Sequence, residues 1–128
     1  MFKRAILAAI AALAVTLPAH ADGDAEKGES VFKKCRACHE VGDDAKNKVG
    51  PRLNDLFGRT AGTVEDFKYS SAMQEAGEGE LIWTEETVGA YLADPRGYIP
   101  KNRMAFPGLK KPEEVADVIA YLKQYSSQ

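Results

Sequence analysis

The sequence predicts an all-α fold, a single small domain made of helices and long loops. Apolar residues recur at helical spacing in several segments, capping residues precede those segments, and almost nothing alternates with the two-residue period of a strand. The chain has 128 residues, which is short for more than one ordinary domain, and no repeat or low-complexity linker divides it. We therefore expect one all-α domain.

Residues 1–21 have the layout of a secretory signal peptide. Basic residues near the start precede an apolar run over residues 5–17, and Pro18-Ala19-His20-Ala21 ends in a small-x-small cleavage pattern. The run is shorter than the roughly 20 residues that a membrane-spanning helix needs. We therefore expect export to the periplasm, removal of residues 1–21, a mature domain over 22–128 and no membrane span.

The first predicted helix covers residues 24–35. Its small and apolar residues recur at positions i, i+3, i+4 and i+7, and Asp24 is a suitable N-cap. Residues 40–53 and 58–68, which follow, are rich in turn-forming residues and are expected to be loops.

Two further helices are predicted from their capping signals. Ser71 and Gln74 fit a capping box for a short helix that Gly77 would end. Thr84 is expected to cap the next helix, which Asp94-Pro95 would end or kink.

The last predicted helix begins at Pro112, which suits a first-turn position and precedes two glutamates. Apolar residues continue at helical spacing as far as Leu122. The stretch from Arg96 to Leu109 is expected to be irregular, because it contains two prolines.

The mature composition predicts a thin hydrophobic core. Removing the signal leaves 128 − 21 = 107 residues, of which 20 are Leu, Ile, Val or Phe. That fraction is close to the limit below which chains tend not to fold, so something else should complete the core. The formal net charge becomes 15 − 19 = −4, which disfavours a nucleic-acid-binding protein.

Cys35-Arg36-Ala37-Cys38-His39 is the Cys-x-x-Cys-His pattern of covalent c-type haem attachment. Two thiols three positions apart can add to the two vinyl groups of one porphyrin, and the adjacent imidazole can then bind the iron. The sequence therefore predicts one covalent haem c, with thioethers from Cys35 and Cys38 and an axial bond from His39.

Three other uses of the cysteines are weaker. A thioredoxin-like redox pair normally follows a strand, whereas the preceding residues are predicted to be helical. A structural zinc site needs about four ligands, and His39 is the one histidine left after the signal is removed. A plain disulfide between Cys35 and Cys38 would close a very small loop and leave His39 without a use.

The iron of an electron carrier takes a second axial ligand, and methionine is the natural candidate here. The mature chain offers Met73 and Met104. Met104 is favoured because it lies in a loop with prolines on both sides, 65 positions after His39. Met73 is predicted to be helical and is more often a core residue in such a position.

Six motifs then occur in a characteristic order: Cys35 to His39, Gly50-Pro51, Phe57-Gly58-Arg59, Trp83-Thr84-Glu85-Glu86-Thr87, Tyr98-Ile99-Pro100 and Met104. In this order they resemble the class I c-type cytochromes, most nearly the group that joins mitochondrial cytochrome c with bacterial cytochrome c2. The resemblance covers essentially all of residues 22–128. It implies a cytochrome c domain whose helices and long loops wrap around one covalently bound haem.

The resemblance also implies roles for individual residues. Met104 would be the distal ligand, and the carbonyl of Pro51 would hold the His39 imidazole. Residues expected to hold the haem propionates or to line the pocket are Arg59, Tyr69, Trp83, Tyr91 and Asn102. Tyr91 would lie near the methionine sulfur. Gly28, Phe32 and Tyr121 would form the contact between the first and last helices.

Two positions depart from the family pattern. Asn102 stands where the family usually has a hydroxyl residue that reaches a propionate, and we expect its amide to be able to replace that contact. Met73 occupies a position often filled by an inward asparagine, which should make the pocket drier and raises the possibility of weak competition for the iron.

By resemblance, the protein would be a monomeric one-electron carrier of the periplasm and not an enzyme. It would take electrons from a quinol–cytochrome c reductase and pass them to a terminal oxidase or a photosynthetic reaction centre. Transient docking of these proteins is expected through a cationic face made of Lys33, Lys34, Lys46, Lys48, Lys101, Arg103, Lys110 and Lys111. Two alternatives stay open: a haem enzyme or gas sensor from which Met104 dissociates, and a subunit that serves one periplasmic dehydrogenase.

Overall fold

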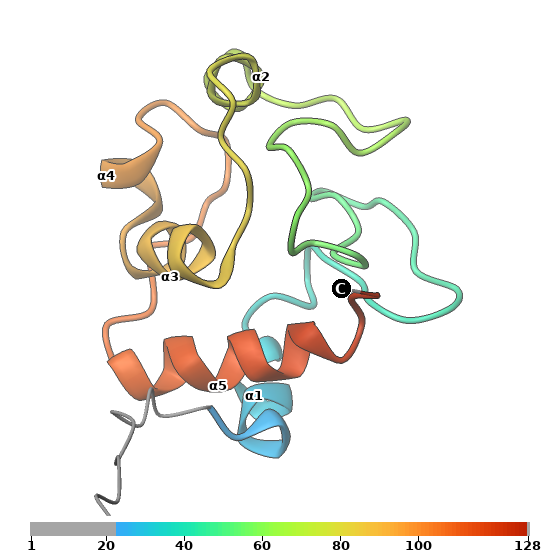
Figure 1. Ribbon diagram of the computed structural model, residues 1–128, viewed down its shortest axis with the longest axis vertical. Helices are drawn as coiled ribbons and strands as arrows, with labels where there is room; N and C mark the ends of the chain where they lie inside the picture. Colours follow the sequence, from blue (N-terminus) through green and yellow to red (C-terminus); the bar gives the residue numbers. More distant parts are fainter. Residues whose placement is uncertain (1–22, 128) are drawn as a thin grey trace, which may run out of the picture.

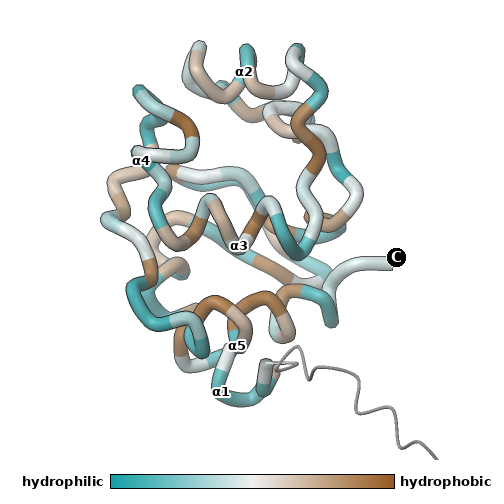
Figure 2. The backbone as a smooth tube through the Cα atoms, turned by 60° about the vertical axis from the view of Figure 1, so that its left-hand side comes forward, coloured by the Kyte–Doolittle hydropathy of each residue, from teal (hydrophilic) through white to brown (hydrophobic). Residues whose placement is uncertain are grey.

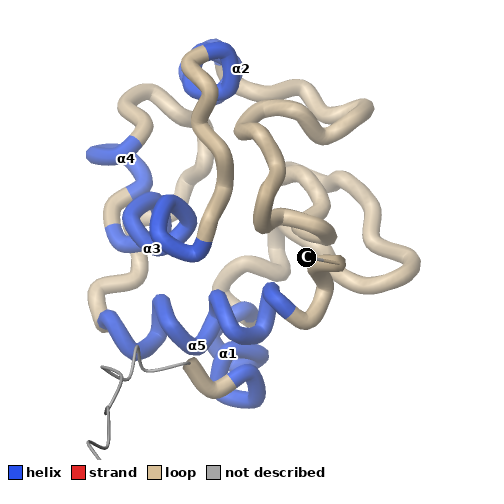
Figure 3. The backbone as a smooth tube through the Cα atoms, viewed as in Figure 1, coloured by secondary structure: helices blue, strands red, loops and turns tan. Residues whose placement is uncertain are grey.

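The computed structural model describes residues 23–127, and the predicted signal peptide lies outside them. The described residues form these helices: α1 (Ala25–Phe32), α2 (Ser71–Glu78), α3 (Glu85–Ala93), α4 (Pro95–Tyr98) and α5 (Pro112–Lys123). Within the same residues, β-structure is limited to one isolated antiparallel bridge between Thr60 and Ile82. The all-α prediction is therefore confirmed, and long loops join the helices (Figure 3). No helix in this part of the chain is long and apolar enough to cross a membrane.

α1 begins as predicted and ends earlier. The carboxylate of Asp24 accepts hydrogen bonds from the backbone N–H groups of Glu26 (2.9 Å) and Lys27 (3.2 Å). The α-helix stops at Phe32, and a run of turns continues to Cys38. The amide of Cys35 donates to the carbonyl of Phe32 at 2.8 Å, an i→i+3 bond that tightens the chain as it enters the cysteine motif.

The N-cap of α2 is one residue earlier than predicted. The Ser70 hydroxyl accepts from the amide of Met73 at 3.1 Å, so the expected capping box of Ser71 and Gln74 is wrong. Gly77 does not end the helix, which continues to Glu78. A Cβ on Gly77 would lie 2.0 Å from the carbonyl oxygen of Ala61, so glycine is needed there for a close approach instead.

The capping signals of the later helices are confirmed, and one short helix was not expected. Thr84 and Thr87 form a reciprocal capping box at the start of α3. Pro95 ends α3 and also opens α4 at its first turn, where the carboxylate of Asp94 accepts from the amide of Gly97 at 3.1 Å. α5 starts at Pro112 as predicted.

α1 and α5 cross at the base of the molecule, and α3 lies above α5 (Figure 1). The rings of Phe32 and Tyr121 have centroids 5.3 Å apart. A Cβ on Gly28 would lie 1.9 Å from the carbonyl oxygen of Asp117, so the absence of a side chain lets the two backbones approach. The expected contact of Gly28, Phe32 and Tyr121 is thus confirmed.

The loops form the other half of the molecule. α3, α4 and the segment that follows α4 lie on one side of Figure 1, and the loops of residues 40–69 lie on the other, with α2 at the top. Apolar positions are concentrated along α5 in Figure 2. Residues of the helices and of both groups of loops share one buried core, which includes Phe32, Leu56, Trp83, Tyr91, Ile99 and Val118.

Candidate functional site

The cysteine motif forms a single compact turn. The amides of Cys38 and His39 both donate to the carbonyl of Cys35, at 3.1 and 2.9 Å. No disulfide joins the two cysteines, and both side chains are half-buried. Burial raises the pKa of the Cys35 thiol to about 11, so this thiol is protonated and uncharged at neutral pH. Two free thiols on one turn, next to an imidazole, match the donor set that covalent haem attachment requires.

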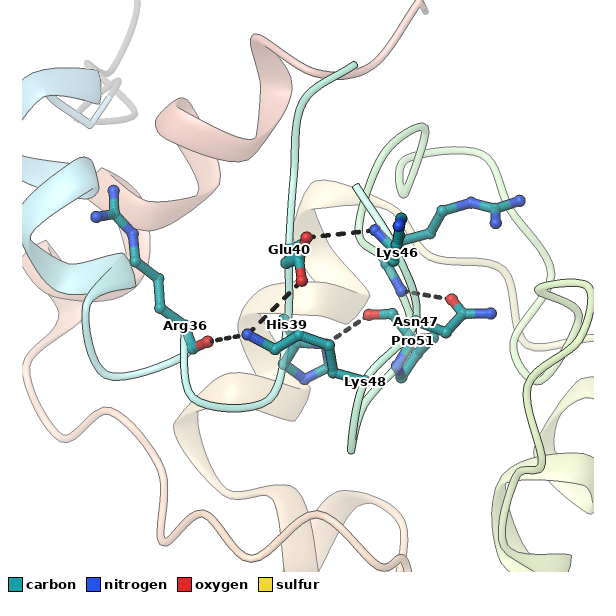
Figure 4. Close-up of polar contacts among 8 residues, drawn as sticks. Arg36, His39, Glu40, Lys46, Asn47, Lys48 and Pro51 are labelled. Atoms are coloured by element: carbon teal, nitrogen blue, oxygen red, sulfur yellow. Dashed lines mark hydrogen bonds and ion pairs between the residues drawn. The ribbon is translucent and has the colours of Figure 1, made fainter. Parts of the chain in front are cut away.

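The His39 imidazole is fixed by the loop that follows it. Its Nδ1 lies 2.7 Å from the carbonyl oxygen of Pro51 (Figure 4), a bond that makes Nδ1 the donor and leaves Nε2 to bind a metal. A Cβ on Gly50 would lie 2.4 Å from Cε1 of the ring, so only glycine fits there. Burial lowers the pKa of His39, which favours the neutral form that ligates iron.

Residues 48–51 also hold the backbone of the cysteine motif. The ammonium of Lys48 donates to the carbonyl of Arg36 at 2.8 Å and lies 3.7 Å from the Glu40 carboxylate, as Figure 4 shows. The amide of Gly50 donates to the carbonyl of Cys38 at 2.9 Å. This support by Lys48 was not predicted, because its charge pointed only to docking.

Met104 is positioned by α3. Its sulfur lies 3.9 Å from the hydroxyl of Tyr91, which donates to it. Burial raises the pKa of Tyr91 to about 12, so the hydroxyl keeps the proton that it donates. Met73 is also half-buried against the core, but among the described residues no such donor reaches its sulfur. The contact with Tyr91 therefore distinguishes Met104 from Met73.

Asn102 lies in the same loop as Met104, and its side-chain amide is hydrogen-bonded to backbone groups. Its amide nitrogen donates to the carbonyls of Pro95 (2.9 Å) and Ile99 (2.8 Å), and its oxygen accepts from the amide of Met104 at 2.8 Å. Both amide hydrogens are thus used, so donation to a propionate would require one of these bonds to break. The sequence contains no signal for this network beyond an asparagine two residues before the methionine.

Arg59, Tyr69 and Trp83 supply donors that lack an anionic partner. The Arg59 guanidinium donates to the carbonyls of Arg52 (3.4 Å) and Asn54 (3.2 Å), and within residues 23–127 no carboxylate forms an ion pair with it. Burial lowers its pKa.

The aromatic residues of this group have spare donors as well. The Tyr69 hydroxyl accepts from the amide of Val64 at 3.0 Å, which leaves its own proton to donate. Trp83 is buried, and its indole N–H has no hydrogen-bond acceptor among the described residues. A half-buried cation with spare neutral donors suits the carboxylates of a haem.

Comparison with known proteins gives a consistent picture. Residues 25–126 match the cytochrome c family. The chain is 53% identical over 100 residues to a cytochrome c2 of Afifella marina, which covers 78% of this chain and 81% of the relative. It is 48% identical over 115 residues to a cytochrome c2 of Blastochloris viridis, covering 90% and 88%. The solved structure of cytochrome c2 from Rhodospirillum centenum superposes with a TM-score of 0.78 at 47% identity, covering 81% of this chain and 99% of that one.

Proposed function

The chain belongs to the cytochrome c family, and we propose that it is an exported electron shuttle of the periplasm. The protein carries covalently attached haem c and is an electron carrier, not an enzyme. We further propose that its electrons come from a quinol–cytochrome c reductase and pass to a terminal oxidase or a photosynthetic reaction centre. The observation that carries the proposal is the compact turn of Cys35 to His39, with its imidazole held by Pro51, in a fold that presents a hydrogen-bonded methionine sulfur.

We propose that four side chains hold the cofactor. Cys35 and Cys38 would form the thioethers, and His39 and Met104 would occupy the two axial positions. Haem c, when bound, exchanges one electron at its iron. Because two side chains would fill both axial positions, no position would be left for a substrate or for oxygen, and this favours electron transfer over catalysis.

The visible spectra of the oxidised and reduced protein test the cofactor and its ligands together. The ferric protein should show the charge-transfer band from a methionine sulfur to iron near neutral pH. Met104→Ala should abolish this band, open the iron to added ligands and lower the reduction potential, while the haem stays covalently attached. Met73→Ala is the matched control and should leave the band in place. Loss of the band in Met73→Ala and not in Met104→Ala would reverse the ligand assignment, and absence of the band in the parent protein would favour an open-site haem enzyme or sensor.

We propose that partner proteins dock on the cationic face defined by Lys33, Lys34, Lys46, Lys48, Lys101, Arg103, Lys110 and Lys111. All eight side chains are exposed. Two of them have acidic neighbours: Lys34 lies 2.9 Å from Glu114, and Lys48 is held by Glu40. Lys110 donates to the carbonyl of Pro107 at 3.1 Å and has no acidic partner within residues 23–127.

Charge reversal tests this face. Lys110→Glu with Lys111→Glu should slow electron transfer to an acidic redox partner, most strongly at low salt, because screening weakens long-range attraction. The double variant Lys27→Glu with Lys68→Glu changes the net charge equally at exposed positions outside the face. Equal slowing in both double variants would show that net charge alone sets the rate and would contradict a localised docking face.

Export can be tested separately. Sequencing the N-terminus of the protein recovered from the periplasmic fraction should give Asp22 as the first residue, because cleavage is expected after Ala21. Recovery of the full chain from the cytoplasmic fraction would contradict the proposed location.

A further inference from the structure

Asn102 makes all of its side-chain hydrogen bonds to backbone atoms near Met104. The amide nitrogen donates to the carbonyls of Pro95 (2.9 Å) and Ile99 (2.8 Å). The amide oxygen accepts from the N–H of Met104 at 2.8 Å. The side chain is half-buried.

The partners fix which way the amide points. A carbonyl oxygen can only accept a hydrogen bond and a backbone N–H can only donate one. Exchanging the oxygen and nitrogen of Asn102 would therefore place two acceptors against its oxygen and a donor against its nitrogen, and all three bonds would be lost.

The two acceptor carbonyls belong to a fixed part of the fold. They lie at the first residue of α4 and at its C-cap, and both Pro95 and Ile99 are buried. Each of these carbonyls also accepts a backbone N–H: the Pro95 carbonyl from Ile99 at 3.0 Å, and the Ile99 carbonyl from Asn102 itself at 3.2 Å. A carbonyl oxygen has two lone pairs, so the Asn102 amide fills the second acceptor site on each. Asn102 supplies donors to them and thereby connects the end of α4 to the backbone of Met104.

We propose that Asn102 is a positioning residue that holds the Met104 backbone against the end of α4 and so keeps the thioether on the iron. The inference rests on the proposed function, in which Met104 is an axial ligand. Tyr91 holds the sulfur from α3, and Asn102 holds the main chain from α4. This role differs from the propionate contact that the family resemblance suggests, because both amide hydrogens already have backbone acceptors.

The rate at which the sulfur leaves the iron tests the proposal. In the ferric holoprotein, binding of imidazole at saturating concentration proceeds at the rate of this opening step. One hydrogen bond changes an equilibrium constant by about fivefold. Removing all three in Asn102→Ala should therefore accelerate opening at least about tenfold and weaken the sulfur-to-iron band. Asn102→Ser keeps one hydroxyl, so its rate should lie between those of the parent and Asn102→Ala. It also serves as the test variant if Asn102→Ala folds poorly. Arg96→Ala, at an exposed residue of α4 outside the docking face, should open at the parent rate.

A general loss of stability has to be separated from positioning. Val118 is a fully buried core residue of α5, so Val118→Ala lowers stability without removing a hydrogen bond of the Met104 loop. Urea is added, at concentrations well below the unfolding midpoints, until the two variants have the same free energy of unfolding. Under these conditions Asn102→Ala should still open faster than Val118→Ala. Equal opening rates in these two variants would overturn the positioning role.

Met104→Ala distinguishes failure of this inference from failure of the proposed function. If Met104→Ala binds imidazole with no slow opening phase while Asn102→Ala opens at the parent rate, then only the positioning role of Asn102 is wrong. If it retains both the slow phase and the sulfur-to-iron band, Met104 is not the ligand, and the proposed ligand set fails with the inference.

Discussion

Replacing Gly89 by alanine should stabilise the protein at the contact between α3 and α5. Gly89 lies in the middle of α3, at an open surface pocket of about 270 Å³ whose lining includes Pro112 and Val115 of α5. A Cβ there would lie 3.6 Å from methyl carbons of Ile119 and Val115, an ordinary van der Waals contact. The free energy of unfolding should rise by about 1 kcal/mol from helix propensity. Half-burying one methyl group should add about 0.4 kcal/mol.

The same substitution at Gly28 should have the opposite sign, which makes it a matched control. Gly28 also lies inside a helix that packs on α5, so the gain in helix propensity is again about 1 kcal/mol. Its Cβ would lie 1.9 Å from the backbone oxygen of Asp117 and 2.8 Å from Cβ of Tyr121. Overpacking of this kind costs about 1–3 kcal/mol. The contacted atoms cannot rotate away, so we expect the upper end and a net loss of about 1–2 kcal/mol.

Urea unfolding of the holoprotein, followed by circular dichroism, measures both effects. Thermal unfolding should show Gly89→Ala melting roughly 5–10 °C higher, because about 1 kcal/mol shifts the Tm of a domain of this size by about 4–8 °C. A lower midpoint for Gly89→Ala would refute the argument that the surface pocket has room for the added methyl group. A parent-like midpoint for Gly28→Ala would show that α1 and α5 are further apart than described.

Two further predictions concern His39 and Met104 as the proposed iron ligands. Tyr91→Phe removes the donor to the Met104 sulfur, so the thioether donates more strongly to ferric iron and the reduction potential should fall. The fall is about 20–40 mV if the bond is worth about 0.5–1 kcal/mol, and voltammetry that shows no change would mean the 3.9 Å contact is without effect. Gly50→Ala should push the His39 ring out of position and change its paramagnetically shifted NMR signals, whereas Val49→Ala, at an exposed neighbour, should leave them unchanged.

Local signals predicted most of the helices. Thr84 caps α3 and Pro112 is the first residue of α5. Both helices carry the expected acidic side chains in the first turn and begin where predicted. The predicted helix boundaries were wrong where the local sequence is compatible with two different helix ends or starts. Pro95 ends one helix and starts another, and sequence alone favours the first reading. Ser70 and Ser71 are both suitable N-cap residues in the sequence; the structure uses Ser70, which is buried, whereas Ser71 is exposed.

The site could be predicted from the sequence where its residues are close together along the chain. Cys35, Cys38 and His39 lie in five consecutive residues, so their proximity needs no knowledge of the fold. The supports around them come from elsewhere in the chain. Nothing local indicates that Gly50 faces the imidazole, or that Arg59 is half-buried with no carboxylate partner among residues 23–127, because both facts depend on how distant loops meet.

Side chains that can serve more than one role show most clearly what the fold adds. The charge of Lys48 suggests docking. Its ammonium, however, lies between the Arg36 carbonyl and the Glu40 carboxylate, which offsets much of the positive charge. Lys34 is similarly paired with Glu114. The field of the proposed docking face must therefore come mainly from its cations without acidic partners, such as Lys111. Charge reversal at those positions should change association more than reversal at Lys34 or Lys48, where loss of an internal contact would add a structural effect.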